Sequence, residues 1–235
     1  MKSVLLLVLG GIIGALVVLG TGRFLVSLFP IQPPEVRVAS TQSIVRDVRS
    51  LGVLTSLRFQ IAKAEVSANV RYGVGGICNI LAKHVMQAFI EAGVDLSAVE
   101  EGDVVFDSQS DLYRITLPAP QLTNCSIDPI ATQQYQVTGA LPVVCPVDTD
   151  ELRRLASYKA IYEFRDEAIE GGILEQAQRQ SALILGTFVR SLTGKETVIE
   201  FEPSTETIFP RSCAPAPPPL WVYDPETNMF SRDSR

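Results

Sequence analysis

The stretch DTDELRRLASYKAIYEFRDEAIEGGILEQAQRQSALILGTFVRSL, residues 148–192, decides the fold class. It contains no proline, and Asp148 followed three residues later by Glu151 resembles the capping box that starts helices. Its apolar residues recur at helical spacing: Leu155, Tyr162, Ile169, Ile173, Ala177, Ile184, Phe188 and Leu192. The pattern predicts one helix of roughly 65 Å at 1.5 Å per residue. Gly171 and Gly172 lower helix propensity in its middle, so we expect a bend there.

Shorter stretches on both sides of this helix have the apolar alternation, or the short apolar runs, that are typical of strands. They cover residues 57–61, 85–94, 104–106, 113–117, 133–137 and 197–201. Gly73, Gly75 and Gly76 mark a turn between two of these strands, and residues 108–110 mark another. The sequence therefore predicts an α+β domain, in which a small, mostly antiparallel sheet packs against one long helix that can bend at its glycine pair.

The N-terminal segment has the pattern of a membrane anchor. Residues 4–20 read VLLLVLGGIIGALVVLG, and no charge follows until Arg23. Crossing the hydrocarbon core takes about 20 apolar residues. A cleaved signal has a shorter apolar region, ending in a small-residue cleavage site that is not evident here. We predict an uncleaved, single-pass signal anchor over residues 1–30, with the lipid bilayer as its partner and the bulk of the chain extracytoplasmic. Cleavage of this segment stays open as the alternative.

The rest of the chain divides into three parts by composition. Residues 31–40 form a linker stiffened by consecutive prolines. Residues 41–202 hold the α+β domain, which begins with helically spaced apolar residues. Residues 203–235 form a Pro-rich tail that we expect to be extended and mobile. Within this tail, residues 220–223 contain the only Trp of the chain and either dock on the domain or stay free for a protein partner.

Charge and histidine content exclude several classes of function. The net charge is −6 and no dense run of Lys or Arg occurs, so nucleic acid is not an expected partner. The single histidine, His84, excludes sites that need several imidazoles, and we expect it at the surface or at a sheet edge. Glu163, Glu167 and Glu170 share one helical face, which predicts a solvated surface rather than a di-iron site. The sequence predicts no catalytic residue, no cofactor and no metal ligand.

Four cysteines are the remaining candidates for site chemistry: Cys78, Cys125, Cys145 and Cys213. An even number outside the cytoplasm predicts disulfides, and three full pairings are open. Cys125 and Cys145 are nearest in sequence, so we favour a bond between them, with Cys78 joined to Cys213. Four reduced thiols are expected if the topology is inverted.

Several of these segments resemble one known family. They are AGVDLS at residues 92–97, VVFD at 104–107, YRITLPAP at 113–120, AIEGGILEQA at 168–177 and ETVIEF at 196–201, after an early Leu54-Thr55. Together they resemble the bacterial family called domain of unknown function 4230, over about residues 44–202. The resemblance implies an N-terminal span, a small sheet, a long helix and a last strand, and it implies no activity.

No constellation of residues indicates a reaction. The sequence therefore predicts a non-enzymatic binding or scaffolding module of the cell envelope, which engages a protein partner or associates with itself. Gly10 and Gly14 form a G-x-x-x-G spacing that lets two spans pack closely. The alternative is an envelope hydrolase that uses carboxylates or a Ser–Lys pair. A deep pocket with converging titratable groups would favour the enzyme, and an exposed apolar surface would favour binding.

Overall fold

The structure is a computed structural model that describes residues 40–139, 144–146, 148–204 and 208–232. The predicted anchor, residues 1–30, lies outside the described residues, as does all of the predicted linker except Ser40. Among the helices that the structure describes, none has the length and apolarity needed to cross a membrane. The described residues form one compact unit.

The unit contains three α-helices, nine strands and short 3-10 turns within these residues. In chain order they are α2 (Thr41–Arg49), β1 (Val53–Tyr72), η1 (Val74–Gly76), β2 (Cys78–Asp95), η2 (Leu96–Ala98), η3 (Glu101–Asp103), β3 (Val104–Asp107), β4 (Leu112–Leu117), β5 (Gln121–Ile127), β6 (Gln133–Thr138), α3 (Thr149–Glu170), α4 (Ile173–Thr193), β7 (Glu196–Phe201), β8 (Trp221–Asp224) and β9 (Met229–Arg232). Every strand predicted from the sequence is present, and several are longer than predicted.

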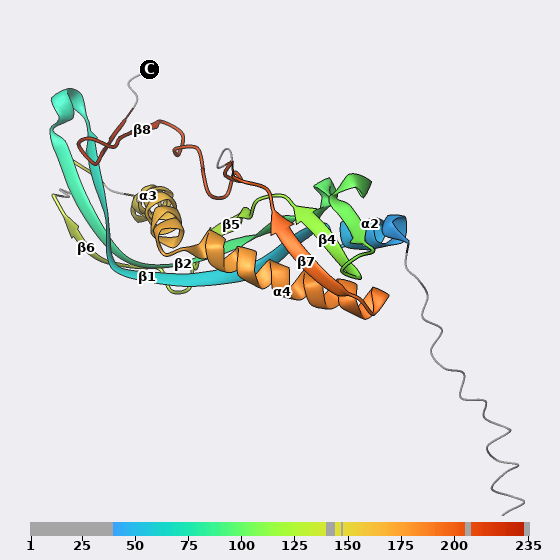
Figure 1. Cartoon of the computed structure of the whole chain (residues 1–235). Coiled ribbons are helices and arrows are strands. Elements are labelled where there is room, and N and C mark those ends of the chain that lie inside the picture. Colours follow the sequence, from blue (N-terminus) through green and yellow to red (C-terminus); the bar gives the residue numbers. More distant parts are fainter. Residues whose placement is uncertain (1–39, 140–143, 147, 205–207, 233–235) are drawn as a thin grey trace, which may run out of the picture. The chain divides into compact units, whose positions relative to one another are not determined.

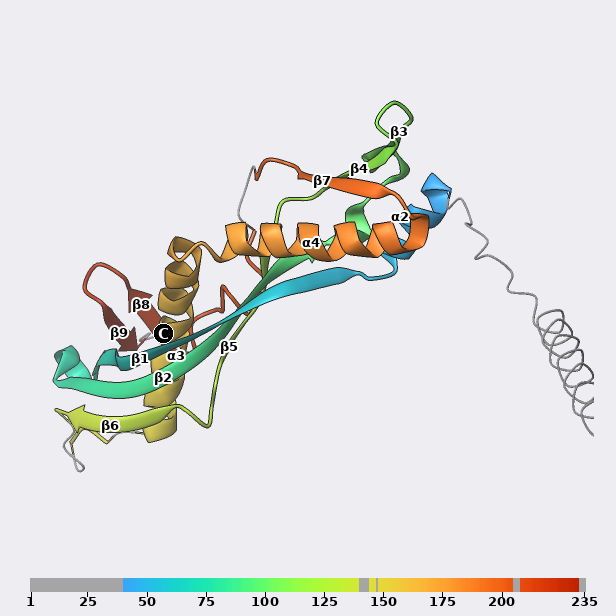
Figure 2. The ribbon, with the colours of Figure 1, turned by 60° about the horizontal axis from the view of Figure 1, so that its bottom comes forward.

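The long hairpin of β1 and β2 organises the fold (Figures 1 and 2). Alternate side chains of β2 are buried from Cys78 to Ala92, which is the period of a strand with one face on a core. The two strands pair antiparallel, with Phe59 opposite Ile90, and the predicted glycine turn joins them at η1. Gly73 and Gly76 have positive φ, which explains why glycines occupy this turn.

The hairpin is the centre of a six-stranded mixed sheet in the order β5-β2-β1-β9-β8, with β6 also on β2. β9 runs parallel to β1, and the other pairs are antiparallel. The sheet curls around α3 (Figure 1). Alanines face each other across this contact and let the helix approach the strands closely: Ala82, Ala88 and Ala92 on the sheet, and Ala156, Ala160 and Ala168 on the helix. Phe164 fills the same core.

The predicted single helix is two helices. Gly172 has φ 75° and ψ 31°, a left-handed conformation that glycine adopts without strain, so α3 ends at Glu170 and α4 starts at Ile173 in a new direction (Figure 2). The buried side chains of α4 are Ile173, Ala177, Ser181, Leu185, Val189 and Thr193. The expectation that Ile184 and Leu192 belong to the buried stripe is wrong, because the break at Gly172 changes which face of the helix meets the strands.

α4 packs on β1 and β2, and also on a second, three-stranded sheet in the order β3-β4-β7. β4 and β7 are parallel, and the predicted hairpin of β3 and β4 is confirmed. α2 closes a second apolar core at this end with Ile44, Val45 and Val48. The predicted α+β class is therefore confirmed. The prediction of one small sheet on one helix is replaced by a large curled sheet, a small sheet and two long helices.

The AGVDLS segment at residues 92–97 has a structural explanation. A Cβ on Gly93 would lie 1.9 Å from the carbonyl oxygen of Leu54, so no other residue fits where β1 and β2 approach at this point. Two residues later, the Asp95 carboxylate accepts a 3.0 Å hydrogen bond from the Ser97 backbone N–H and caps η2. Leu96 between them is fully buried. The GVDLS motif therefore maintains the fold.

The C-terminal tail is docked, which corrects the prediction of a mobile segment. Cys213, Trp221 and Phe230 are all buried in the main core, and β9 extends the large sheet beside β1. Tyr162 also donates a 2.9 Å hydrogen bond to the carbonyl of Pro215. Proline limits regular strand pairing in this region but does not prevent docking, because aromatic side chains and one disulfide attach the tail to α3 and β5.

Candidate functional site

Both disulfides differ from the predicted pairing. Cys78 is bonded to Cys145, and Cys125 is bonded to Cys213. The prediction of Cys125–Cys145 is wrong because β5 and β6 pair with different parts of β2. β5 lies along residues 88–93, whereas β6 lies along residues 81–85, nearer the turn, so the chain after β6 arrives beside Cys78. Two buried disulfides are typical of an oxidising, extracytoplasmic location, as predicted.

His84 is inside the protein, which corrects the prediction of a surface or edge position. Its side chain is fully buried on the face of β2 that meets the main core, and its ring nitrogens have no regular hydrogen bond within the described residues. Burial lowers the pKa of His84, the nearby charge of Arg153 adds to this effect, and Gln134 and the Val66 backbone oppose it. A neutral, buried imidazole without a nucleophile partner fits a core position.

The carboxylates on α3 are engaged in ion pairs with β1. Lys63 lies 3.3 Å from Glu163 and 3.1 Å from Glu167, and Lys159 lies 3.3 Å from Glu163. Within the described residues, no group of acidic, histidine and cysteine side chains could hold a metal ion. These ion pairs join the helix to the sheet at a solvent-accessible face. The side chains of Glu163 and Glu167 are 32% and 50% exposed and Glu170 is exposed, so the predicted solvated face is confirmed.

One Ser–Lys pair occurs within the part of the chain that the structure describes, and its surroundings do not suit catalysis. Lys159 Nζ lies 3.1 Å from the carbonyl oxygen of Ser67 and 3.5 Å from its Oγ. A catalytic lysine of this kind has to be neutral so that it can accept the serine proton. Here Lys159 forms an ion pair with Glu163, and its shorter contact with Ser67 is to the backbone carbonyl and not to Oγ. The pair joins α3 to β1.

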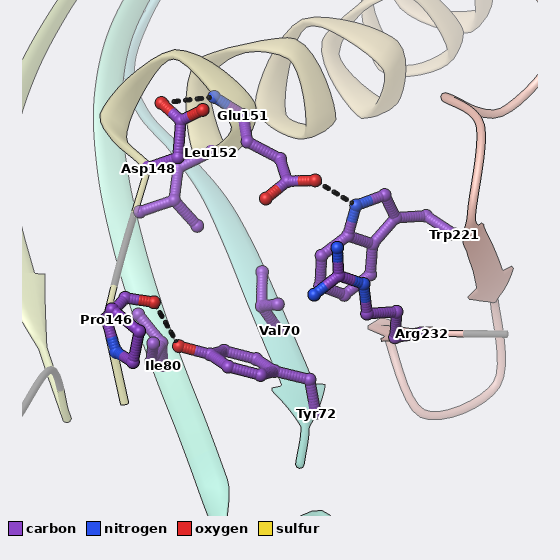
Figure 3. A pocket seen from close by; sticks show the side chains of 9 residues that line it. All are labelled: Val70, Tyr72, Ile80, Pro146, Asp148, Glu151, Leu152, Trp221 and Arg232. Atoms are coloured by element: carbon purple, nitrogen blue, oxygen red, sulfur yellow. Dashed lines mark hydrogen bonds between the residues drawn. The ribbon is translucent and has the colours of Figure 1, made fainter. Parts of the chain in front are cut away.

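A small pocket lies between the start of α3, the end of the hairpin and the tail (Figure 3). Its lining residues are Val70, Tyr72, Ile80, Pro146, Asp148, Glu151, Leu152, Trp221 and Arg232. Its volume is about 40 Å³, and one water needs about 10–15 Å³ on this measure, so the pocket has room for a few waters and is too small for an organic ligand. No sequence pattern predicted this pocket; the one feature that could have indicated it is the chain's only Trp.

Hydrogen bonds fix the walls of this pocket. The indole N–H of Trp221 donates to Glu151 across 2.8 Å, and the Tyr72 hydroxyl donates to the carbonyl of Pro146. The Arg232 guanidinium lies over the Trp221 ring, 5.9 Å from the centre of the ring (Figure 3). Burial raises the pKa of the Tyr72 hydroxyl; Glu151 raises it further, while Arg232 opposes this. Tyr72 is therefore a neutral donor at physiological pH.

A larger, open depression adjoins the pocket at the hairpin turn. We call it the tip depression; it is lined by Arg71, Tyr72, Gly73, Val74, Gly76, Ser231 and Arg232. Its volume is about 590 Å³, which is in the range of small-molecule sites. Arg71 and Arg232 are exposed, and neither has a carboxylate partner among residues that the structure describes. Among the residues described, no acidic side chain lines it, so the tip depression favours anions.

The fold and the disulfides define the class of protein, which is an α+β domain with the disulfides typical of an extracytoplasmic location. A family model described as "Protein of unknown function (DUF4230)" matches residues 48–199, and the chain belongs to this family. The resemblance noted in the sequence is thus confirmed. No curated protein and no solved structure matches the chain. The family assigns no activity, so the geometry of the site has to carry the functional argument.

Proposed function

We propose that this protein is a membrane-anchored, extracytoplasmic binding module of the cell envelope, and that its ligand site is the tip depression. The observation that carries the proposal is the pair of guanidinium groups, Arg71 and Arg232, in one depression of about 590 Å³; neither has a carboxylate partner within the described residues. The buried disulfides support the location, and the apolar run of residues 4–20 supports the anchor.

The chemistry of the depression matches a small oxyanion. A guanidinium donates paired hydrogen bonds to carboxylate or phosphate oxygens, and it keeps its charge at every physiological pH. Ser231 adds a hydroxyl beside the two arginines, and Tyr72 forms part of the wall. The backbone around them is held by the pairing of Arg71 with Ser231 in the sheet. A phosphate or carboxylate group would therefore meet donors on two sides without rearrangement of the strands.

The only Trp of the chain makes this proposal directly testable. Trp221 contacts Arg232 and lies beside the depression, so occupancy should change its fluorescence. The full-length chain in phosphatidylcholine nanodiscs is titrated with glycerol phosphate, with glycerol at the same ionic strength as the control. We expect a saturable change for glycerol phosphate that is lost in Arg71→Gln/Arg232→Gln. Equal responses to both solutes, or an unchanged response in the variant, would defeat the proposal.

The alternative of an envelope hydrolase depends on Ser67 and Lys159. A fluorophosphonate probe reacts with activated serines, so labelling measures this alternative without a known substrate. We expect no labelling of the full-length chain, because the Lys159 ammonium is paired with Glu163. Labelling that disappears in Ser67→Ala would establish the enzyme and overturn the proposal of a non-catalytic module.

A further inference from the structure

We propose that the turn of the long hairpin is a lipid-contacting finger, which binds the surface of a bilayer that carries anionic phospholipids. Here we call residues 71–77 the finger. This inference rests on the proposed function, because it uses the same two arginines, and it goes further by naming the ligand as a phospholipid headgroup in a membrane. The finger has exposed apolar side chains at its tip, and the guanidinium groups of Arg71 and Arg232 lie in the depression directly behind them.

The apolar part of the finger is unusually exposed. Val74 is 96% exposed and Ile77 is 69% exposed, and they flank the glycines of the turn. Two further apolar residues lie in segments attached to this end: Val144 next to Cys145, at 59%, and Leu220 next to Trp221, at 57%. Large apolar side chains gathered at a protruding turn are typical of a surface that contacts a membrane or a partner.

Positive charge distinguishes a bilayer from an apolar protein partner. Arg71 and Arg232 lie in the tip depression with Val74, so a headgroup phosphate could meet both guanidiniums while Val74 enters the interfacial region. Two acidic residues of the adjoining small pocket, Asp148 and Glu151, do not line the depression. The Asp148 carboxylate accepts the backbone N–H groups of Asp150 and Glu151, and the Glu151 carboxylate accepts the indole N–H of Trp221.

A disulfide and a strand pairing hold the finger in place. Cys78 directly follows it, and its bond to Cys145 attaches the base of the finger to the segment that precedes α3. β9 supports the other strand, with Arg71 opposite Ser231. A turn that is held in this way loses little conformational freedom on binding. The entropic cost of ordering it therefore offsets less of the binding free energy.

A bilayer that binds the finger would meet the domain at the hairpin turn. α2 and the finger lie at opposite ends of the hairpin (Figure 2). β1 alone rises at most roughly 66 Å between these ends, at 3.3 Å per residue. The test therefore holds the N-terminal segment in one bilayer and offers a separate bilayer to the finger, so that binding through the finger is measured apart from the anchor.

The experiment measures recruitment of the full-length chain, held in phosphatidylcholine nanodiscs, to separate vesicles by flotation. Vesicles contain phosphatidylcholine alone, or phosphatidylcholine with phosphatidylglycerol. We expect about tenfold or stronger recruitment to the anionic vesicles, weakened by added salt. Val74→Ser/Ile77→Ser should lose most of this recruitment, and Arg71→Gln/Arg232→Gln should lose the preference for anionic lipid.

Leu183→Ser is the matched control, because Leu183 is an apolar residue of α4 that is 65% exposed and distant from the finger. It should behave like the unmodified chain, and thermal melts verify that every variant is folded. The inference is overturned if recruitment is equal for both vesicles, or if Val74→Ser/Ile77→Ser binds normally. A Trp221 response to glycerol phosphate without vesicle recruitment rejects the lipid finger and leaves the proposed function standing; loss of both rejects both.

Discussion

The indole nitrogen of Trp221 donates a 2.8 Å hydrogen bond to the carboxylate of Glu151, and this bond joins the C-terminal tail to the first turn of α3. Trp221 is buried, so its N–H has no access to bulk solvent as a substitute acceptor. The sequence predicted Glu151 as part of a capping box. In the structure Asp148 does cap the helix, and the Glu151 side chain accepts from the tail.

Replacing Glu151 with Ala should lower the free energy of unfolding by about 2 kcal/mol, because a buried donor loses a charged acceptor. Glu151→Gln keeps an acceptor oxygen and should recover part of this loss. Glu170→Ala is the control, since Glu170 is exposed at the end of the same helix. Chemical denaturation followed by Trp221 fluorescence measures all three. Similar effects from Glu151→Ala and Glu170→Ala would mean that the bond does not stabilise the docked tail.

The observed disulfides predict two peptide pairs in mass spectrometry without reductant: Cys78 with Cys145, and Cys125 with Cys213. Replacing both Cys125 and Cys213 with Ser should lower the free energy of unfolding by roughly 3–5 kcal/mol, since the bond closes a long loop in the unfolded chain. The tail should then become the first site of proteolytic cleavage. Recovery of a Cys125–Cys145 peptide would contradict this connectivity.

Two adjacent residues of α4 should differ in how strongly a new charge destabilises the protein. Leu185 is buried in the second core, whereas Ile184 is 37% exposed. Leu185→Asp should therefore lower stability by more than about 3 kcal/mol, because an unpaired charge is buried, and Ile184→Asp by less than about 1 kcal/mol. Thermal melts of the two variants measure the difference. A larger effect at Ile184 would place the opposite helix face against the sheets.

His84 should make the protein less stable in mild acid. Burial lowers its pKa in the folded state, so the unfolded chain binds the proton more readily. The contribution of neutral His84 to the free energy of unfolding is therefore fully present above the unfolded pKa of about 6.5. It falls as the pH drops below that value toward the folded pKa. The loss attributable to His84 should be at most about 1.4 kcal/mol at pH 5.5.

His84→Leu removes the only imidazole of the chain, so the difference between it and the unmodified chain isolates this titration. Urea denaturation at pH 7.5 and pH 5.5 measures this difference. If both proteins lose the same stability on acidification, the imidazole does not titrate differently in the folded and unfolded states.

The predicted anchor leads to a test on intact cells. The protein should remain in membranes after an alkaline carbonate wash, because an apolar span is held by the bilayer core. Protease added to spheroplasts should digest the domain beyond the anchor. Release by carbonate would remove the anchor from the proposal, and protection from protease would reverse the proposed topology.

Local sequence determined much of the secondary structure. Gly172 interrupts the helical pattern because glycine tolerates a positive φ, and the turn at residues 73–76 follows from the same property. The alternating apolar residues of β1 and of β7 predicted strands because a strand places successive side chains on opposite faces. The apolar run of residues 4–20 predicts an anchor on its own, because the thickness of a bilayer sets that length.

Tertiary structure alone decided which distant segments meet. Cys125 and Cys145 are close in sequence, yet the curled sheet carries them to different partners. Tyr72, Trp221 and Arg232 form one site only because β9 pairs with β1 and brings the tail to the hairpin turn. Propensity and periodicity act over a few residues, whereas strand pairing, curl and the helix break set contacts between segments that are far apart in the chain.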